Sequence, residues 1–262
     1  MGAHGPHPPV AGRDRERVKR GNGMEREELE LRGIPCTVWG RPSDSAYVFV
    51  HGKMASREAA AAFAVIAEKA GYQTLSFDLP GHGERKAAGE RCDIWNGVRD
   101  LNIAGEYAFS RWKRLGLYGC SLGAYFSLNA YAEKPFRKCL FQSPVADMEY
   151  LIRQMMNWFS VTPERLEREK EIETPVDLMT WEYYRYVLAH PAEKWNVPTE
   201  ILFAEKDSLQ SEAVIRRFAE RFGCGLTVAP GCEHPFMAPE DEKVVNDWLE
   251  KHIRFPEGED LR

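Results

Sequence analysis

The sequence has no long apolar run, and this absence excludes a membrane-spanning helix of ordinary length. A helix that crosses a bilayer needs about 18 or more consecutive apolar residues. No uninterrupted stretch of the 262 residues approaches that length. The beginning of the chain also lacks the apolar centre of a secretion signal. We therefore expect no membrane span and a cytoplasmic location.

Cysteine is scarce, and motifs for metals or nucleotides are missing. The six cysteines form no C-x-x-C pair and are too sparse for a disulfide scaffold, so we expect free thiols. The chain has no H-E-x-x-H motif and no phosphate-binding P-loop. The segment Gly81-His82-Gly83 lacks the third glycine of a dinucleotide fingerprint. The sequence therefore predicts no metal site and no nucleotide site.

Positive charge is not in excess either. The chain carries 35 Lys and Arg against 40 Asp and Glu, which gives a net charge of −5. This balance does not support nucleic-acid binding or a polybasic membrane anchor. Apolar material, in contrast, is plentiful, with 44% hydrophobic and 11% aromatic residues. The chain can bury a sizeable core, which excludes disorder of the whole protein.

Composition and periodicity divide the chain into three kinds of segment. Residues 1–23 are rich in Gly, Pro, His and Arg, and we expect a disordered leader or extension there. From Leu29 onward, apolar runs of strand length alternate with amphipathic stretches of helix length. This alternation predicts an α/β fold with a parallel sheet covered by helices on both faces. The expected strands include residues 46–50, 74–77, 115–118, 138–142, 200–204 and 226–228.

Residues 145–195 interrupt the alternation. This stretch is helical in pattern, dense in Met, Trp and Tyr, and much longer than an ordinary connection. We interpret it as an inserted helical cap on an α/β core formed by residues 24–144 and 196–256. Its apolar side chains either pack as the core of the cap or line a substrate pocket at the carboxyl-end rim of the sheet. The candidate pocket residues are Met155, Met156, Trp158, Phe159, Trp181 and Tyr184.

The segment Gly119 to Gly123 matches the G-x-S-x-G motif of a nucleophilic serine. It directly follows the expected strand 115–118 and opens the next expected helix. A turn this sharp strains the serine backbone and presents its hydroxyl at a helix N-terminus. We therefore predict that Ser121 is a catalytic nucleophile rather than a simple helix cap. The neighbouring Cys120 is expected to be a buried thiol.

A serine nucleophile needs a base, and the base needs an orienting acid. His234 follows Ser121 in the chain and lies in a loop between the last strand and the last helix, so we predict that it is the base. Asp207 follows the strand 200–204 and is the predicted acid. Glu205 and Asp147 are close enough in position to compete with it.

The tetrahedral intermediate of acyl transfer also needs hydrogen-bond donors for its oxyanion. One predicted donor is the backbone N–H of Leu122, directly after the nucleophile. The other is the backbone N–H of Lys53, in the loop after the strand 46–50. The Lys53 side chain has no predicted catalytic task.

Together these residues resemble the α/β-hydrolase fold serine hydrolases, in the branch of small capped esterases, lipases and S33-type peptidases. The resemblance extends from about Leu29 to Ile253. It implies a mostly parallel eight-stranded sheet, no cofactor, and hydrolysis through an acyl-serine intermediate. Lys53 departs from the pattern, because an apolar or aromatic residue is commoner there. The motifs that carry the resemblance are His51-Gly52, the turn from Asp78 to Gly83, the turn at Ser121, Asp207, and Glu233-His234-Pro235.

The predicted function is hydrolysis of a small to medium hydrophobic carboxylic ester, with a small-molecule substrate as the partner. Amide, peptide or thioester hydrolysis with the same three residues is an alternative, since the triad does not fix the bond that is cleaved. A ligand-binding or receptor protein that retains the hydrolase pocket is an alternative of another class. The natural substrate and the oligomeric state remain open.

Overall fold

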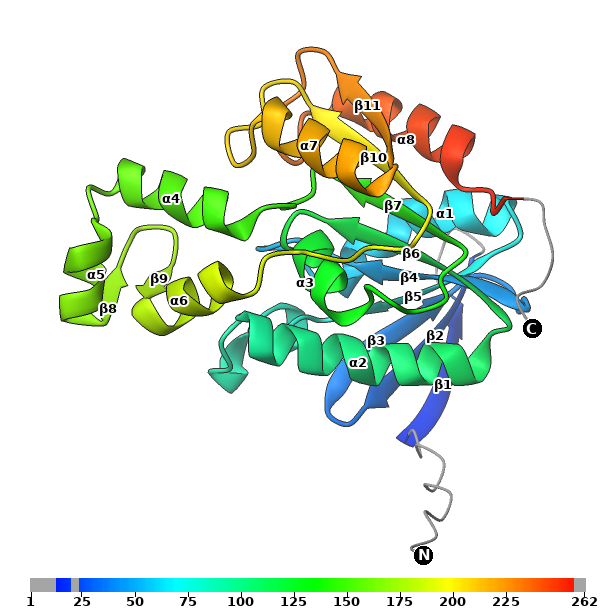
Figure 1. The fold of residues 1–262 in the computed structure, drawn as a ribbon. Helices are drawn as coiled ribbons and strands as arrows, with labels where there is room; N and C mark the ends of the chain where they lie inside the picture. The colour runs from blue at the N-terminus through cyan, green and yellow to red at the C-terminus, as the bar shows by residue number, and fades with distance from the viewer. Residues whose placement is uncertain (1–12, 20–23, 257–262) are drawn as a thin grey trace, which may run out of the picture.

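The computed structural model describes residues 13–19 and 24–256, and a nine-stranded sheet forms the centre of this part (Figure 1). The order across the sheet is β1-β2-β3-β5-β4-β6-β7-β10-β11. The strands span β1 (Arg13–Lys19), β2 (Glu25–Leu31), β3 (Ile34–Trp39), β4 (Ser45–Val50), β5 (Gln73–Phe77), β6 (Arg114–Cys120), β7 (Lys138–Gln142), β10 (Thr199–Ala204) and β11 (Gly225–Ala229). Apart from β1, this order contains eight strands, which confirms the expected eight-stranded sheet.

The sheet is mostly parallel. All neighbouring strands from β5 to β11 run in the same direction, whereas β3 pairs with β5, and β2 with β3, antiparallel. The chain visits β4 before β5, yet β4 lies between β5 and β6 in the sheet. The strand order therefore reverses beside β4, and ligands of open α/β sheets bind at the carboxyl ends of strands at such a point.

The expectation that residues 1–23 stay outside the fold is wrong for residues 13–19. They form β1, which pairs antiparallel with β2 at the edge of the sheet, with Val18 opposite Arg26. An edge strand offers unpaired backbone N–H and C=O groups to any extended segment, whatever side chains that segment carries. Composition alone therefore did not reveal the pairing. The rest of the predicted leader, residues 1–12 and 20–23, lies outside the described residues.

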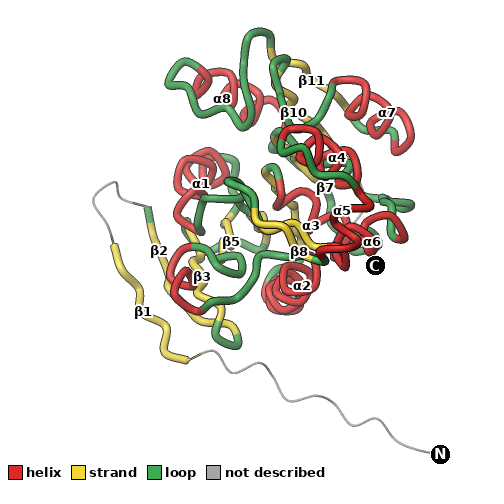
Figure 2. The backbone as a smooth tube through the Cα atoms, turned by 90° about the vertical axis from the view of Figure 1, so that its left-hand side faces the viewer, coloured by secondary structure: helices red, strands yellow, loops and turns green. Residues whose placement is uncertain are grey.

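Helices cover both faces of the sheet, as predicted (Figures 1 and 2). Outside residues 145–195 they are α1 (Ala60–Lys69), α2 (Ile94–Arg111), α3 (Leu122–Ala130), α7 (Glu212–Phe222) and α8 (Asp241–His252), with short 3-10 helices η1 (Arg57–Ala59) and η2 (Gly83–Ala88). Successive side chains of a strand point to opposite faces. In β4, Tyr47 therefore joins α1 and α8 in one core layer, and Val48 joins α2, α3 and α7 in the other.

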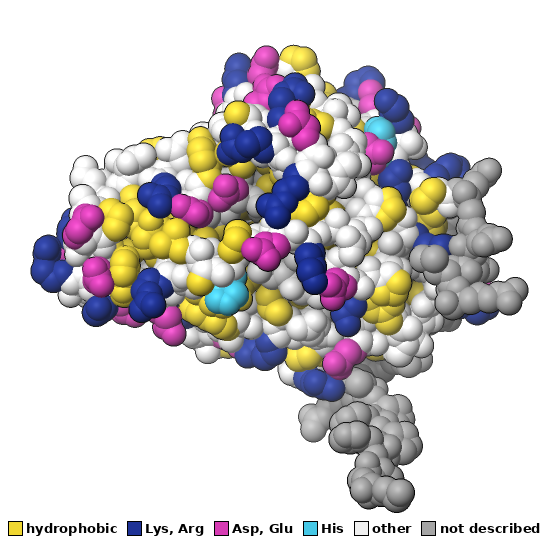
Figure 3. Space-filling view, viewed as in Figure 1, with side chains coloured by type: hydrophobic (Ala, Val, Ile, Leu, Met, Phe, Trp, Pro, Cys, Tyr) yellow, Lys and Arg dark blue, Asp and Glu magenta, His cyan; other side chains and the backbone are white. Residues whose placement is uncertain are grey.

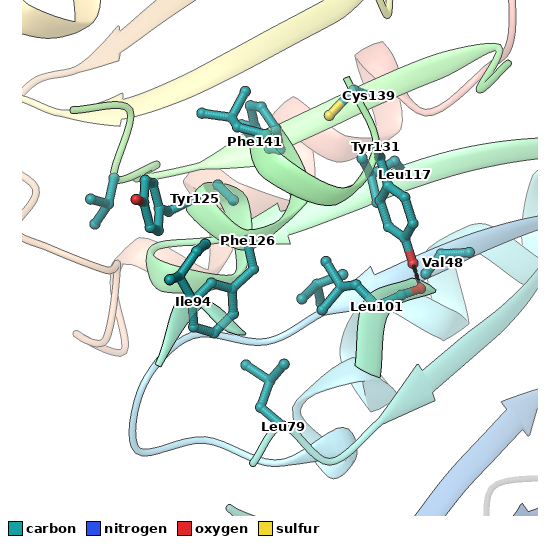
Figure 4. Packing of buried hydrophobic residues seen from close by; sticks show 14 of the residues in the cluster. Val48, Leu79, Ile94, Leu101, Leu117, Tyr125, Phe126, Tyr131, Cys139 and Phe141 are labelled. Carbon is teal, nitrogen blue, oxygen red and sulfur yellow. Dashed lines mark hydrogen bonds between the residues drawn. The ribbon is translucent and has the colours of Figure 1, made fainter. Parts of the chain in front are cut away.

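Helix α3 is held tightly between the sheet and α2 (Figure 4). A Cβ atom at Gly97 of α2 would lie 2.7 Å from the ring of Phe126 on α3, so only glycine permits this close approach. At the end of α3 the Tyr131 hydroxyl donates a hydrogen bond to the backbone carbonyl of Leu101 on α2. Both contacts fix the axis of α3, and with it the residue that precedes the helix, Ser121.

The segment 145–195, which we call the insertion, extends beyond the sheet as a separate layer (Figure 1). It contains α4 (Met148–Trp158), α5 (Pro163–Glu169), β8 (Glu171–Glu173), β9 (Leu178–Thr180) and α6 (Trp181–Ala189). The expectation of a purely helical insertion is wrong, because β8 and β9 form an antiparallel hairpin. Pro175 lies in its turn, which the Thr174 N–H closes by donating to the Asp177 carbonyl at 3.0 Å.

No helix within residues 13–19 and 24–256 is long and apolar enough to cross a membrane.

Candidate active site

Ser121 occupies a sharp turn between β6 and α3, as the motif predicts. Its backbone has φ 51° and ψ −117°, a conformation that costs free energy in a residue with a side chain. The neighbours make the turn possible because a Cβ atom at Gly123 would lie 2.4 Å from the carbonyl oxygen of Val50. Only 6% of Ser121 is exposed. The turn therefore places one serine hydroxyl at the carboxyl end of β6, directly before a helix.

A chain of two hydrogen bonds joins Ser121, His234 and Asp207. Ser121 Oγ lies 2.8 Å from His234 Nε2, and His234 Nδ1 lies 2.7 Å from Asp207 Oδ2. Asp207 follows β10, and His234 lies in the loop between β11 and α8. Three segments far apart in the sequence thus bring the three predicted residues together. The spacing allows a proton to pass from the serine to the histidine while the carboxylate orients the ring.

Asp207 is the carboxylate that meets His234, and its two rivals are engaged elsewhere. The second oxygen of Asp207, Oδ1, accepts hydrogen bonds from the backbone N–H groups of Leu209 at 2.8 Å and Gln210 at 3.1 Å. These bonds hold the carboxylate so that Oδ2 faces the imidazole. Glu205 accepts instead from the backbone of the loop at residue 231. Asp147 caps α4 by accepting from the Tyr150 N–H at 2.9 Å.

Gln210 links the acid loop to the start of the insertion, a role that the sequence did not predict. Only 1% of the residue is exposed. Its side-chain oxygen accepts from the Asp147 N–H at 2.9 Å, and its side-chain nitrogen donates to the Asp147 carbonyl at 3.0 Å. One side chain therefore pairs with both backbone groups of the residue that begins α4. The loop that holds Asp207 and the first turn of the insertion are fixed to each other.

The loop after β4 passes directly beside Ser121. A Cβ atom at Gly52 would lie 3.1 Å from Ser121 Cβ, so the loop backbone approaches the serine as closely as glycine allows. Lys53 and Leu122, which carry the two predicted oxyanion donors, both line the cavity that contains Ser121. The structure therefore brings the two backbone segments to the cavity that contains Ser121.

Two histidines that are not part of the hydrogen-bonded chain tie this loop to the turn after β5. His51 Nε2 accepts from the Leu79 N–H at 3.1 Å, and His82 Nε2 accepts from the Met54 N–H at 3.0 Å. An accepting Nε2 requires the neutral ring with its proton on Nδ1, and His51 Nδ1 lies 2.7 Å from the Gly52 carbonyl. Burial lowers the pKa of His51 to about 4, which keeps the ring neutral. Both histidines lie in segments that carry the resemblance, but no role of either ring was predicted from the sequence.

This lowered pKa predicts that acid destabilises the fold through His51. Between about pH 6.5 and pH 4 the unfolded chain binds a proton at this ring and the folded chain does not, so acidification favours unfolding. The contribution of His51 to stability is therefore complete above pH 6.5 and declines by about 3 kcal/mol toward pH 4. Urea denaturation at several pH values should show a flatter profile for His51→Gln than for the unchanged protein.

The exposed His190 gives a matched control. His190→Gln makes the same substitution at an exposed position, so it controls for the change of residue itself. Carboxylates titrate in the same pH range, but they are common to all three proteins and cancel in the comparison. Equal slopes for His51→Gln and the unchanged protein would contradict the assigned role of burial.

A cavity of about 150 Å³ opens beside Ser121, and the insertion forms most of its wall. Met155, Trp158 and Tyr184 line it, in agreement with the predicted pocket. The wall also includes Met148, Leu151 and Ile152, which were not predicted from the sequence. Together with Met155 they occupy positions i, i+3, i+4 and i+7 of α4, the spacing of one helix face. That periodicity is visible in the sequence and could have identified the wall.

Three of the predicted pocket residues do not line this cavity. Met156 lies one position after Met155, which turns it by about 100° around the helix axis into the core layer. Phe159 caps the C-terminus of α4. Trp181 lines a separate surface pocket together with Trp95. The prediction was wrong for these residues because hydrophobicity alone does not tell the two faces of a helix apart. Hydrophobic side chains also remain on the surface between α4 and α6 (Figure 3).

Cys120 lies directly before Ser121 in the sequence and carries a free thiol. Its side chain is not paired in a disulfide. Burial raises the pKa of the Cys120 thiol to about 12, with a smaller contribution from the negative charge of Asp207. The thiolate is the nucleophilic form of cysteine, so a thiol that stays protonated at neutral pH is a poor nucleophile. Ser121 is therefore the residue in this turn that the geometry equips to react.

The fold agrees with a comparison to known families. The chain belongs to the alpha/beta hydrolase family, whose model matches residues 47–248. The match runs from β4 to α8 and includes Ser121, Asp207 and His234. No curated protein sequence matches the chain.

Several solved structures have the same fold. The ferulic-acid-bound Est1E of Butyrivibrio proteoclasticus has a TM-score of 0.69 at 17% identity, over 86% of this chain and 96% of that chain. Esterase Pf2001 of Pyrococcus furiosus has a TM-score of 0.61 at 18% identity, over 92% and 91%. Monoacylglycerol lipase of Paleococcus ferrophilus has a TM-score of 0.60 at 18% identity, over 84% and 99%. At such identities the likeness establishes the fold alone.

Proposed function

We propose that the protein is a serine hydrolase that cleaves small to medium hydrophobic carboxylic esters through an acyl-serine intermediate. The observation that carries this proposal is the continuous hydrogen-bonded chain from Ser121 through His234 to Asp207, at the edge of an apolar cavity. Each of the three groups has the chemistry that its position requires: a hydroxyl, an imidazole and a carboxylate.

In the first half of the proposed reaction, Ser121 Oγ attacks the carbonyl carbon of the ester. His234 Nε2 accepts the hydroxyl proton as the bond forms, and Asp207 Oδ2 stabilises the resulting imidazolium by accepting from Nδ1. The negative charge that develops on the carbonyl oxygen is stabilised by the backbone N–H groups of Lys53 and Leu122. His234 then gives the proton to the departing alcohol, which leaves the acyl group on Ser121.

In the second half, water hydrolyses the acyl-enzyme, with water as the attacking group and Ser121 as the leaving group. His234 accepts a proton from the water as its oxygen attacks the acyl carbon, and then returns that proton to Ser121 Oγ. The insertion contributes by roofing the serine as a cap, so that the ester sits against apolar side chains and bulk water is kept away. A hydrophobic acyl or aryl group is the natural occupant of such a site.

The structural neighbours support an ester substrate only indirectly. Two are called esterase or lipase, and another holds ferulic acid; these are statements about those proteins. Amide, peptide or thioester hydrolysis is the second candidate, since the same three residues serve those reactions. A binding protein without turnover is the third, and the complete hydrogen-bonded chain argues against it. A cytoplasmic location stays a prediction from the sequence, and the oligomeric state stays open.

Covalent labelling tests the proposed nucleophile. A fluorophosphonate probe should label the unchanged protein, because it phosphonylates an activated serine, and Ser121→Ala should abolish the label. The same sample assayed on p-nitrophenyl esters, acyl thioesters and aminoacyl amides would identify the bond that is cleaved.

Cys120→Ala is the matched control, since it changes the adjacent residue and leaves the serine in place. It should retain full labelling. A label that survives in Ser121→Ala and disappears in Cys120→Ala would refute the serine mechanism. Labelling without turnover of any ester, thioester or amide would instead favour a binding protein.

A further inference from the structure

The cavity beside Ser121 is small for a site that binds esters. Its volume of about 150 Å³ is similar to that of an apolar protein cavity that holds one benzene molecule, which has about six carbon atoms. Ser121 and both residues with proposed oxyanion donors line it. The group that stays on the serine after the first step is the acyl group. The acyl group is therefore the part of the substrate that this cavity would enclose.

The turn of the β8–β9 hairpin forms part of the wall of the cavity. Val176 and Asp177 of this turn both line it. The turn is held in shape by its own hydrogen bonds: the Thr174 hydroxyl donates to the Asp177 carbonyl at 2.6 Å and accepts from the Asp177 N–H at 3.0 Å. Asp177 Oδ1 in addition accepts from the Leu178 N–H at 2.9 Å. One carboxylate oxygen is thus fixed within the hairpin, and the other is free to bind a neighbour.

That neighbour is Lys53, which reaches the hairpin from the loop after β4. Its ammonium group forms an ion pair with Asp177 Oδ2 and donates to the Val176 carbonyl at 3.2 Å. Lys53 therefore has two roles: its backbone supplies a proposed oxyanion donor, and its side chain binds the turn of the β8–β9 hairpin. A second ion pair, between Arg91 and Glu171 at 3.8 Å, is longer and joins two exposed side chains.

We propose that Lys53 is a specificity-determining residue that limits the size of the acyl group. Its bonds to Val176 and Asp177 hold this part of the cavity wall in place, so that the cavity has no room for acyl chains longer than about six carbons. This inference rests on the proposed ester hydrolysis. The ion pair is partly exposed, and such pairs shift an equilibrium by no more than about fivefold, so the expected effect is moderate.

The test measures kcat/KM on p-nitrophenyl acetate, butanoate, hexanoate and decanoate. The unchanged protein should prefer the three shorter esters. Asp177→Asn keeps the hydrogen bond to Leu178 but loses the charge, and Lys53→Met keeps most of the stem but loses the ammonium. Each should raise the ratio of kcat/KM for decanoate over butanoate about three- to fivefold. The double variant should raise it no further than Lys53→Met does alone, because Lys53→Met already removes the ion pair that Asp177→Asn removes.

Lys194→Met is the matched control. Lys194 also forms an ion pair, with Glu133 at 3.1 Å, and neither residue lines the cavity. Its ratio should equal that of the unchanged protein. Ester hydrolysis with unchanged ratios in Lys53→Met and Asp177→Asn, or a preference of the unchanged protein for decanoate, would overturn the size limit alone. Failure of the unchanged protein to hydrolyse any ester would refute the proposed function, and this inference with it.

Discussion

Ser121→Ala, His234→Ala and the double variant should each lose about 10⁵- to 10⁶-fold in kcat for ester hydrolysis, with nearly the same loss in all three. The reason is that the serine and the histidine act as one unit through their 2.8 Å contact. Once either is removed, the other contributes almost nothing. Steady-state kinetics on the best ester of the series measures the loss. If the loss of kcat in the double variant equalled the product of the two single losses, the two residues would act independently, and this explanation would be wrong.

Asp207→Asn should cost less, about 10⁴-fold, since an amide in place of the carboxylate favours the wrong tautomer of His234. Asp147→Asn is the matched control, because Asp147 was an alternative candidate for the acid and caps α4 in the structure. Its kcat should fall by far less, and the stability of the protein should change little, because Asn caps a helix N-terminus about as well as Asp does. A larger kcat loss in Asp147→Asn than in Asp207→Asn would reassign the acid.

Asp78→Ala should have the largest effect on stability, lowering the free energy of unfolding by about 3–5 kcal/mol. Asp78 is fully buried, and its carboxylate pairs with the buried guanidinium of Arg57. Its oxygens also accept from the backbone N–H groups of Arg57 at 2.8 Å and Glu84 at 3.0 Å. Removing the carboxylate takes from Arg57 its fully buried partner, leaving the exposed Glu84, and takes an acceptor from two backbone N–H groups.

Urea denaturation at pH 7 measures this effect, and Asp247→Ala is its control. Asp247 forms an exposed ion pair with Lys243 on α8, and such pairs contribute about 0–1 kcal/mol. The loss in Asp78→Ala should be several times greater. The loop after β4 begins two residues before Lys53 and leads into Arg57, so residual Asp78→Ala enzyme should also show a lower kcat. A stability change within 1 kcal/mol would show that Arg57 finds water or another partner.

The sequence by itself determined the parts of this protein that depend on short-range pattern. Alternating apolar strands and amphipathic helices predicted the parallel sheet, because burial on both faces leaves that pattern in the residues themselves. The glycines around Ser121 predicted the strained turn, since steric exclusion acts on immediate neighbours. Chain order and strand-end position predicted that Asp207 and His234 would meet the serine, because parallel strands deliver their carboxyl ends to one edge.

Only the tertiary structure decided which partner each surface would meet. From composition, residues 13–19 were expected to lie outside the fold. They pair with the edge strand β2 nevertheless, because this pairing uses backbone groups and does not depend on the side chains. The apolar content of the insertion predicted burial, yet it did not separate Met155 at the cavity from Met156 in the core, since a single residue step turns a helix by about 100°. The contacts of Gln210 with Asp147 and of Lys53 with Asp177 join segments 63 and 124 residues apart. Such contacts leave no periodic signal in the sequence, because they depend on how whole elements are packed rather than on what lies beside each residue in the chain.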